Sequence, residues 1–173
     1  MAGFILCNIK QCNDGGKLKT ILMTLLYVVN GNKVLLAEKK RGFGSGLYNG
    51  AGGKVDAGET VEQAMIRETQ EEWGITPVKY EQVALNSFEV MHKGERSLAV
   101  VHIFIATEYI GQPQETDEMK PVWFDTNEIP YDRMWASDPF WLPRVLKGEK
   151  VKGNYVFDDK NKVVSHVIEG LSL

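Results

Sequence analysis

Cysteine is scarce in this chain, since Cys7 and Cys12 are the only two among 173 residues. Two cysteines do not make a disulfide framework, and a structural zinc site would need further ligands close to them. Disulfides rarely persist in the cytosol. We therefore expect reduced thiols in a cytoplasmic protein.

The sequence also lacks a long apolar run and an excess of positive charge. No stretch approaches the roughly 20 apolar residues of a membrane span, and residues 1–10 are too short and too polar toward their end for a signal peptide. The formal net charge of -3 and the pI of about 5.7 give no general attraction to nucleic acid or to an anionic membrane. We expect a monomer that binds a small molecule, with any phosphate contact made at a local site.

Two glycine-rich stretches lack what a common nucleotide-binding loop needs. Residues 42–46, GFGSG, are not followed directly by a helix, as a dinucleotide-binding loop would be. Residues 50–54, GAGGK, resemble a P-loop, but Tyr48 stands where its first glycine belongs and Val55 where a magnesium-binding Ser or Thr belongs. We interpret both stretches as turns.

The hydrophobic pattern predicts an α+β domain with a mixed sheet and two main helices. The expected strands cover residues 20–29, 34–40, 83–91, 96–107, 122–124, 151–157 and 162–169, with a short strand inside 41–54 and turns at 30–33 and 92–95. One helix should begin after Thr60, which forms a capping box with Gln63, and end at Gly74. A second should begin near Asp138 and Pro139 and run to residue 147. We divide the chain into an N-terminal arm, 1–18, and one domain, 19–173.

The first helix carries a cluster of three glutamates near its end, Glu68, Glu71 and Glu72. Like charges three or four residues apart on a helix repel, and the last turn of a helix favours cations rather than anions. On a helical wheel the three fall within a sector of about 100°, beside the apolar stripe. The cluster therefore lies at the edge of the expected core and is locally unfavourable.

A bound cation would relieve this repulsion. Carboxylate oxygens suit Mg²⁺ or Mn²⁺, and Mg²⁺ usually shares its coordination with substrate phosphates. The alternative is a solvated acidic patch with no ligand, which is common on helices. We expect a Mg²⁺ cofactor, with Mn²⁺ as a substitute, and a phosphate-bearing substrate.

Residues 53–75, GKVDAGETVEQAMIRETQEEWGI, resemble the signature of the Nudix hydrolase family. The matching positions are Gly53, Glu59, Arg67, Glu68, Glu71, Glu72, Gly74 and Ile75. Thr69 departs from the pattern, since the family prefers an aliphatic residue there. The resemblance implies an α/β/α sandwich and Mg²⁺-dependent hydrolysis of a nucleoside diphosphate linked to another group.

The same resemblance implies roles for individual residues. Glu68, Glu71 and Glu72 would bind the metal, together with the backbone of Gly52 and Gly53. Glu59 and Arg67 would brace the loop and the helix, and Arg67 would orient a catalytic glutamate. Either Glu68 or Glu118 would be the general base.

Most of residues 20–170 resemble the MutT-type branch that hydrolyses oxidised purine nucleoside triphosphates, through residues 39–55, 115–124 and 129–143. By position, the expected base-binding residues are Asn49, Phe88, Trp135, Asp138 and Thr24, and the expected phosphate-binding residues are Lys39 and Lys54. In that branch two adjacent aspartates read the base. Here the pair is Ser137-Asp138, and Asp138 could instead only cap the helix that follows it.

The leading hypothesis is a Mg²⁺-dependent pyrophosphohydrolase that converts 8-oxo-dGTP and 2-hydroxy-dATP to monophosphates and pyrophosphate, and so cleans the nucleotide pool. Because Ser137 replaces one of the two aspartates, a second hypothesis remains. In it the protein is a Nudix hydrolase that acts on another nucleoside diphosphate derivative or on an unmodified or methylated purine nucleotide. A third reading is a non-catalytic module that senses a nucleotide.

Overall fold

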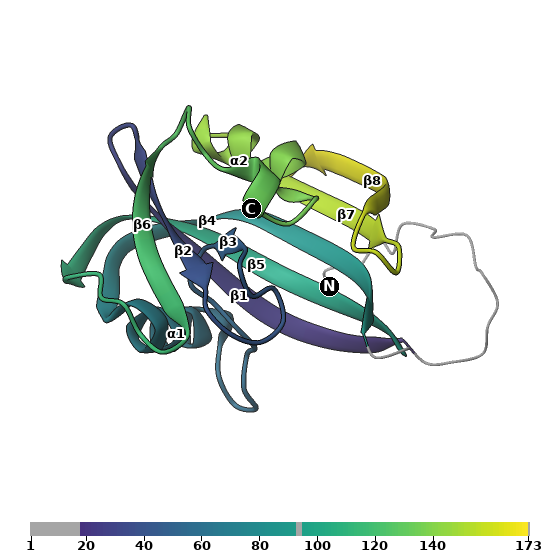
Figure 1. Cartoon of the computed structure of the whole chain (residues 1–173), viewed down its shortest axis with the longest axis horizontal. Coiled ribbons are helices and arrows are strands. Elements are labelled where there is room, and N and C mark those ends of the chain that lie inside the picture. The colour runs from purple at the N-terminus through teal and green to yellow at the C-terminus, as the bar shows by residue number, and fades with distance from the viewer. Residues whose placement is uncertain (1–17, 93–94, 173) are drawn as a thin grey trace.

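The computed structural model describes residues 18–92 and 95–172, which form one eight-stranded mixed sheet and two α-helices (Figure 1). The elements in chain order are β1 (Lys19–Asn30), β2 (Lys33–Lys39), β3 (Tyr48–Asn49), α1 (Val61–Trp73), β4 (Ile75–His92), β5 (Glu95–Gly111), β6 (Met119–Asp125), the 3₁₀ turn η1 (Tyr131–Arg133), α2 (Asp138–Leu146), β7 (Val151–Phe157) and β8 (Val163–Gly170). The predicted α+β class is confirmed.

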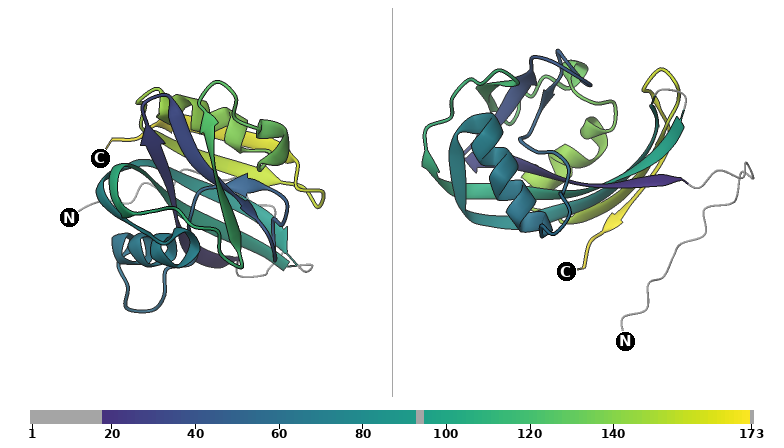
Figure 2. Two further views of the ribbon diagram at one scale, coloured as in Figure 1. Left: turned by 60° about the vertical axis from the view of Figure 1, so that its left-hand side comes forward. Right: turned by 90° about the horizontal axis from the view of Figure 1, so that it is seen from below.

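The sheet is mixed because two of its strand pairs are parallel. Its strand order is β3-β2-β1-β5-β4-β7-β8, and β6 also pairs with β2. β1 runs parallel to β5 and β4 runs parallel to β7, whereas the other pairs are antiparallel. The sheet is strongly curved, and α1 and α2 lie on opposite sides of it (Figure 2).

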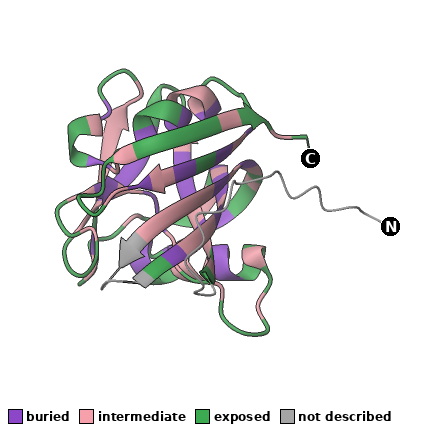
Figure 3. Ribbon diagram, turned by 90° about the vertical axis from the view of Figure 1, so that its right-hand side faces the viewer, coloured by how far each residue is buried: buried purple, intermediate pink, exposed green. Residues whose placement is uncertain are grey.

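Strand alternation divides the buried side chains between two hydrophobic cores, one on each face of the sheet. On β2, Leu35 belongs to the core under α1 and its neighbour Leu36 to the core under α2, and neither side chain is exposed. Successive side chains of a strand point to opposite faces, so a continuous apolar run such as β2 predicts burial on both sides. The outer strand β8 is mostly exposed (Figure 3).

The first helix begins and ends as its sequence predicts. Thr60 accepts a hydrogen bond from the Gln63 amide at 3.1 Å, and the Gln63 side chain accepts one from the Thr60 amide at 2.8 Å. Gly74 ends the helix at φ 70°, a left-handed conformation that favours glycine. Thr69, the residue that departs from the family pattern, is fully buried. Its hydroxyl donates a hydrogen bond to the Met65 carbonyl at 2.7 Å, so this buried polar atom has a partner.

Some predicted boundaries were wrong, because the strands extend beyond their apolar segments. β4 and β5 reach Ile75 and Gly111, and β6 covers Met119–Asp125 because it pairs along the whole of β2. The N-terminal arm, with both cysteines, lies outside the described residues except for residue 18, and so does part of the 92–95 turn. In the described part of the chain, neither helix has the length and apolar character needed to cross a membrane.

Candidate active site

The three glutamates of α1 occupy three different environments. Glu72 is buried at 6% exposure, the Glu68 side chain is 16% exposed, and the Glu71 side chain is 60% exposed. This gradient agrees with their expected place at the edge of the core-facing stripe. Glu72 and Glu68 have thus lost most of their contact with water, whereas Glu71 has kept it.

The Glu72 carboxylate is fixed against the loop that precedes α1. Its Oε2 accepts a hydrogen bond from the Gly52 amide at 2.9 Å. Burial raises the pKa of Glu72 to about 7, and the charges of Glu68 and Glu118 also raise it, whereas the Gly52 bond and the Lys39 charge oppose the rise. Lys39 therefore lies close enough to this carboxylate to interact with it electrostatically.

Arg67 joins the same loop to the helix. It makes a two-point contact with Glu59 through Nε at 2.7 Å and Nη2 at 2.9 Å, and its Nη1 donates to Glu68 at 2.9 Å and to Glu71 at 3.3 Å. Its Nη2 also donates to the Lys54 carbonyl at 3.1 Å. The hydrogen bonds to Arg67 are the largest cause that lowers the pKa of Glu59, to about 2, and the bonds to Glu59 and Glu68 raise the pKa of Arg67 above its ordinary value.

The two glycines of this loop allow a very close approach to β1 and to α1. A Cβ atom at Gly53 would collide with the Glu68 carboxylate, with Oε2 only 2.8 Å away, and one at Gly52 would collide with the Thr24 backbone. The Gly53 carbonyl accepts a hydrogen bond from the Thr24 amide at 2.9 Å and retains a second lone pair. Side chains at either position would displace the carboxylate or separate the loop from β1.

A cavity of about 340 Å³ lies beside these carboxylates. Its lining consists of Arg41, Glu68, Glu71, Glu72, Thr116, Asp117 and Glu118. Arg41 donates to Glu118 at 2.8 Å, which lowers the pKa of Glu118, and Thr116 donates to the Glu72 carbonyl at 3.2 Å. Sequence reasoning missed Arg41, Thr116 and Asp117, because nothing in the local pattern shows that residues 41 and 116–118 meet at the end of α1.

The chemistry of this cavity fits a hard divalent cation, since five carboxyl groups surround it. The present positions of these carboxyl groups are less favourable for holding a cation. Among residues 18–92 and 95–172, no three acidic, histidine or cysteine side chains are grouped closely enough to hold an ion as they stand. Arg67 contacts Glu68 and Glu71 instead. An ion held by Glu68, Glu71 and Glu72 would have to replace these contacts with Arg67.

On the other face of the sheet, a second polar group forms around Asp138. Asp138 is 3% exposed, and its carboxylate accepts hydrogen bonds from the Trp141 indole at 3.2 Å, the Ser137 hydroxyl at 3.3 Å and the Trp135 amide at 3.2 Å. Burial raises the pKa of Asp138 to about 7. The sequence left open whether Asp138 only caps the helix that follows it. Asp138 is instead the first residue of α2, and the cap position belongs to Ser137.

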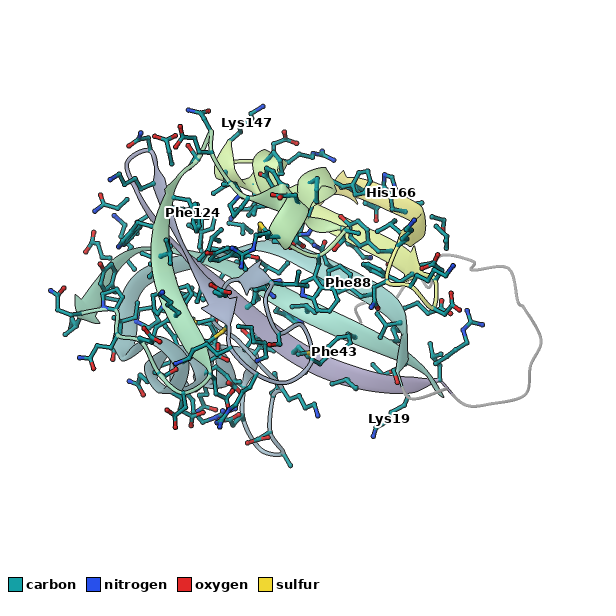
Figure 4. All side chains as sticks on the ribbon, in the orientation of Figure 1. Lys19, Phe43, Phe88, Phe124, Lys147 and His166 are labelled. Carbon is teal, nitrogen blue, oxygen red and sulfur yellow. The ribbon has the colours of Figure 1, made fainter. Side chains whose placement is uncertain are left out.

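The remaining expected base-binding residues are divided among several places. Asn49 Oδ1 accepts from the Tyr27 hydroxyl at 2.8 Å and from the Gly50 amide at 2.9 Å. Phe88, labelled in Figure 4, packs against the core under α2 and stacks on Tyr155 with ring centroids 5.2 Å apart. Strand alternation places the Thr24 side chain on the α1 side of β1 instead, with Leu26.

Trp135 packs against Phe43, an aromatic residue that sequence reasoning left inside a flexible turn. Their ring centroids are 5.0 Å apart, and both line a cavity of about 580 Å³ together with Gly42, Gly44, Ser45, Leu47, Met134, Ala136 and Asn161. Asn49, Phe88 and Asp138 are not part of this lining. Of the two expected phosphate contacts, Lys39 is half-buried near Glu72, and the Lys54 side chain is exposed.

Comparisons with known proteins agree with this arrangement. Residues 20–145 match the family model described as NUDIX domain. The chain is 45% identical over 148 residues to an oxidized purine nucleoside triphosphate hydrolase of Danio rerio, covering 86% of this chain and 94% of that protein, and 41% identical over 145 residues to the protein of the same name of Mus musculus, covering 84% and 92%.

A solved structure extends the likeness to the fold. The crystal structure of a MutT protein from Bacillus halodurans superimposes with a TM-score of 0.74 at 25% sequence identity, and the match covers 86% of this chain and 97% of that one. The family model covers nearly all of β1, the strands β2 to β6, α1 with its glutamates and most of α2, whereas β7 and β8 follow the matched residues. On this evidence the chain belongs to the Nudix family.

Proposed function

We propose that this protein hydrolyses oxidised purine nucleoside triphosphates to the monophosphate and pyrophosphate, and thereby removes them from the nucleotide pool. The two vertebrate relatives named for this activity align with most of the chain and support the substrate class. The observation that carries the proposal is the buried Glu72 carboxylate, fixed by the Gly52 amide beside a cavity lined by four further carboxyl groups.

Glu68, Glu71 and Glu72 would hold a Mg²⁺ or Mn²⁺ ion, with the Gly52 or Gly53 carbonyl as a further ligand. Such an ion, when bound, neutralises charge on the phosphates and lowers the pKa of water. Its positive charge would also replace the interaction that Arg67 now gives Glu68 and Glu71. Arg67 would remain anchored through its two-point contact with Glu59.

The chain's own groups supply the rest of the reaction. Lys39, near Glu72 and Glu118, would bind the phosphates, and Lys54 would approach them from the loop before α1. Either Glu68 or Glu118 would accept the proton of the attacking water. Both are paired with an arginine, Glu68 with Arg67 and Glu118 with Arg41, so each must be released from that contact to act as a base.

The purine would lie on the α2 side of the sheet. The Asn49 oxygen is already occupied by Tyr27 and Gly50, so Asn49 would offer its N–H donors to the base. Phe88 and Trp135 would contact the ring, and Asp138 would bind its edge. Thr24 would not belong to this group, because strand alternation places its side chain on the α1 side of β1.

A second candidate is a Nudix hydrolase with a different purine nucleotide as its substrate. The Ser137 hydroxyl donates to Asp138, which leaves one buried carboxyl to read the base. A single carboxyl gives less discrimination than two, so unmodified or methylated purine nucleotides would compete better. In both cases the protein would act as a cytoplasmic monomer on a small molecule, without nucleic acid or membrane.

A substrate panel tests these proposals. Release of pyrophosphate or monophosphate is measured with 8-oxo-dGTP, 2-hydroxy-dATP, dGTP, ADP-ribose and a dinucleoside polyphosphate, each with Mg²⁺. Higher kcat/KM for the two oxidised nucleotides supports the leading proposal, and equal or higher kcat/KM for another substrate supports the second. Tight binding of a nucleotide without any hydrolysis would instead indicate a sensing module.

A further inference from the structure

Asn86 and Tyr155 place unpaired polar atoms in the interior of the core under α2. Asn86 is fully buried and Tyr155 is 1% exposed. In the part of the chain that the structure describes, neither the oxygen nor the nitrogen of the Asn86 carboxamide has a hydrogen-bond partner, and the same holds for the Tyr155 hydroxyl. Buried polar groups are nearly always paired, so three unpaired atoms in one place need an explanation.

The two side chains meet over Gly153. A Cβ atom there would lie 2.7 Å from the Tyr155 hydroxyl and 2.8 Å from Asn86 Oδ1, so both groups converge on the space that a side chain would fill. Asn86 pairs with Gly153 across β4 and β7, and Phe88 pairs with Tyr155 in the same register. The absence of a side chain at position 153 lets the tyrosine ring lean toward the carboxamide.

Their surroundings connect this pair to the expected base site. Burial, and after it the charge of Asp138, raises the pKa of both Tyr155 and Tyr27, so the Asp138 carboxyl acts on both hydroxyls. Phe88 is two residues from Asn86 on β4, on the same face, and is only half-buried. The face of β4 thus runs from a partly open aromatic surface at Phe88 to a closed polar end at Asn86, roughly 7 Å further along the strand.

We propose that Asn86 and Tyr155 are specificity-determining residues that read the edge of the purine ring. This inference rests on the proposed function. A carboxamide pairs best with an edge that offers one donor and one acceptor side by side. Unmodified guanine offers two acceptors there, O6 and N7, whereas 8-oxoguanine carries a hydrogen on N7 and offers a donor beside an acceptor. Asn86 therefore favours the oxidised base, and Tyr155 supplies a further donor or acceptor.

The experiment compares Asn86→Leu and Tyr155→Phe with the unchanged protein. Binding of 8-oxo-dGMP and of dGMP is measured by calorimetry in EDTA, so that neither metal nor turnover is needed. Each variant should lower the preference for 8-oxo-dGMP by about tenfold, because a lost partner leaves a polar edge of the ligand unpaired. The ratio of kcat/KM for 8-oxo-dGTP and dGTP should fall in parallel.

Thermal unfolding without ligand separates this role from a structural one. Removing polar atoms that lack partners should leave the unfolding midpoint unchanged or raise it, so that selectivity falls while stability does not. Tyr80→Phe is the matched control, since this ring packs against Phe104 in the core under α1 and its change should not affect selectivity.

A preference that stays within twofold of the unchanged protein in both variants overturns the inference. If Asn86→Leu does not fold, Tyr155→Phe alone decides, because it removes one oxygen and keeps the ring. Hydrolysis failing in the unchanged protein while its preference for 8-oxo-dGMP persists would count against the proposed function and not against this pair. Equal binding of both monophosphates by the unchanged protein overturns the inference directly.

Discussion

At the scale of single residues, Glu72 and Asp138 are two buried carboxyl groups with opposite surroundings. Burial raises the pKa of each to about 7. Glu72 adjoins a charged cavity that contains four other carboxyl groups and Arg41, whereas Asp138 interacts with an indole and with tyrosine hydroxyls. The first environment suits a cation and phosphates, and the second suits the polar edge of a flat ring.

Glu72→Gln should abolish most of the activity without harming the fold. The amide oxygen of glutamine can still accept the Gly52 hydrogen bond, so the free energy of unfolding should stay the same or rise by up to about 1 kcal/mol. The loss of the negative charge should lower kcat/KM by at least about 100-fold, or about 3 kcal/mol of transition-state stabilisation. Glu62→Gln, in the exposed first turn of the same helix, is the control. Activity above a tenth of normal in the Glu72 variant would contradict the metal argument.

Asp138 should make stability depend on pH in a way that Asp138→Asn removes. Its folded pKa, about 7, lies above the ordinary aspartate value, so the folded state binds the proton more tightly than the unfolded state does. The stabilisation is complete below about pH 4 and is lost as the pH rises toward 7, by up to about 4 kcal/mol. Urea unfolding of both proteins at several pH values in EDTA measures the difference. Parallel curves from pH 4 to pH 8 would show that Asp138 ionises normally.

At the scale of elements, α1 and the loop before it act as one unit because Arg67 joins them. Glu59 and the Lys54 carbonyl belong to the loop, and Glu68 and Glu71 belong to the helix. Gly52 and Gly53 bring the loop against β1 and the glutamates. The position of the carboxylates therefore depends on the loop as much as on the helix.

Arg67→Lys should weaken catalysis more than binding. Lysine keeps the charge but cannot contact Glu59 at two points while also reaching Glu68. We expect kcat to fall about 10-fold to 100-fold with KM nearly unchanged. The kcat of a Glu59→Gln/Arg67→Lys double variant should be no lower than that of the less active single variant, because the two residues act as one unit. Arg144→Lys is the control, since Arg144 lies on α2 and forms an exposed ion pair with Glu149, which follows the helix. A rise in KM alone, or additive losses in the double variant, would argue against a positioning role.

The elements also show what the sequence could predict. The capping box of Thr60 and Gln63, the left-handed Gly74 and the edge position of Glu72 depend on residues within one helix, and each prediction was confirmed. The contact of Phe43 with Trp135 and the convergence of Asn86 with Tyr155 depend on distant segments, so no local pattern indicates them. Asn86 gives one local indication, because it is a polar residue at a core-facing position of a strand. The roles given to the site residues stay predictions.

At the scale of the whole molecule, one sheet serves two cores, and each core supports a different part of the proposed site. The core under α1 contains Met65 and Trp73 and holds the helix that carries the glutamates. The core under α2 contains Trp141 and packs against Phe88, beside Asp138. Because the strands are shared, damage to either core should destabilise the entire domain, but only one part of the site should lose its geometry.

Leu35→Ala and Leu36→Ala test this division with neighbouring, fully buried leucines on opposite faces of β2. Each should lower the free energy of unfolding by about 2–5 kcal/mol, and each should unfold in a single transition seen alike by far-UV circular dichroism and tryptophan fluorescence. In the folded proteins, Leu35→Ala should raise the Mg²⁺ concentration needed for half-maximal activity, and Leu36→Ala should weaken binding of 8-oxo-dGMP measured in EDTA. Two separate unfolding transitions would show that the cores are independent. Equal effects of both variants on metal requirement and on base binding would show that the sheet does not keep the two parts of the site apart.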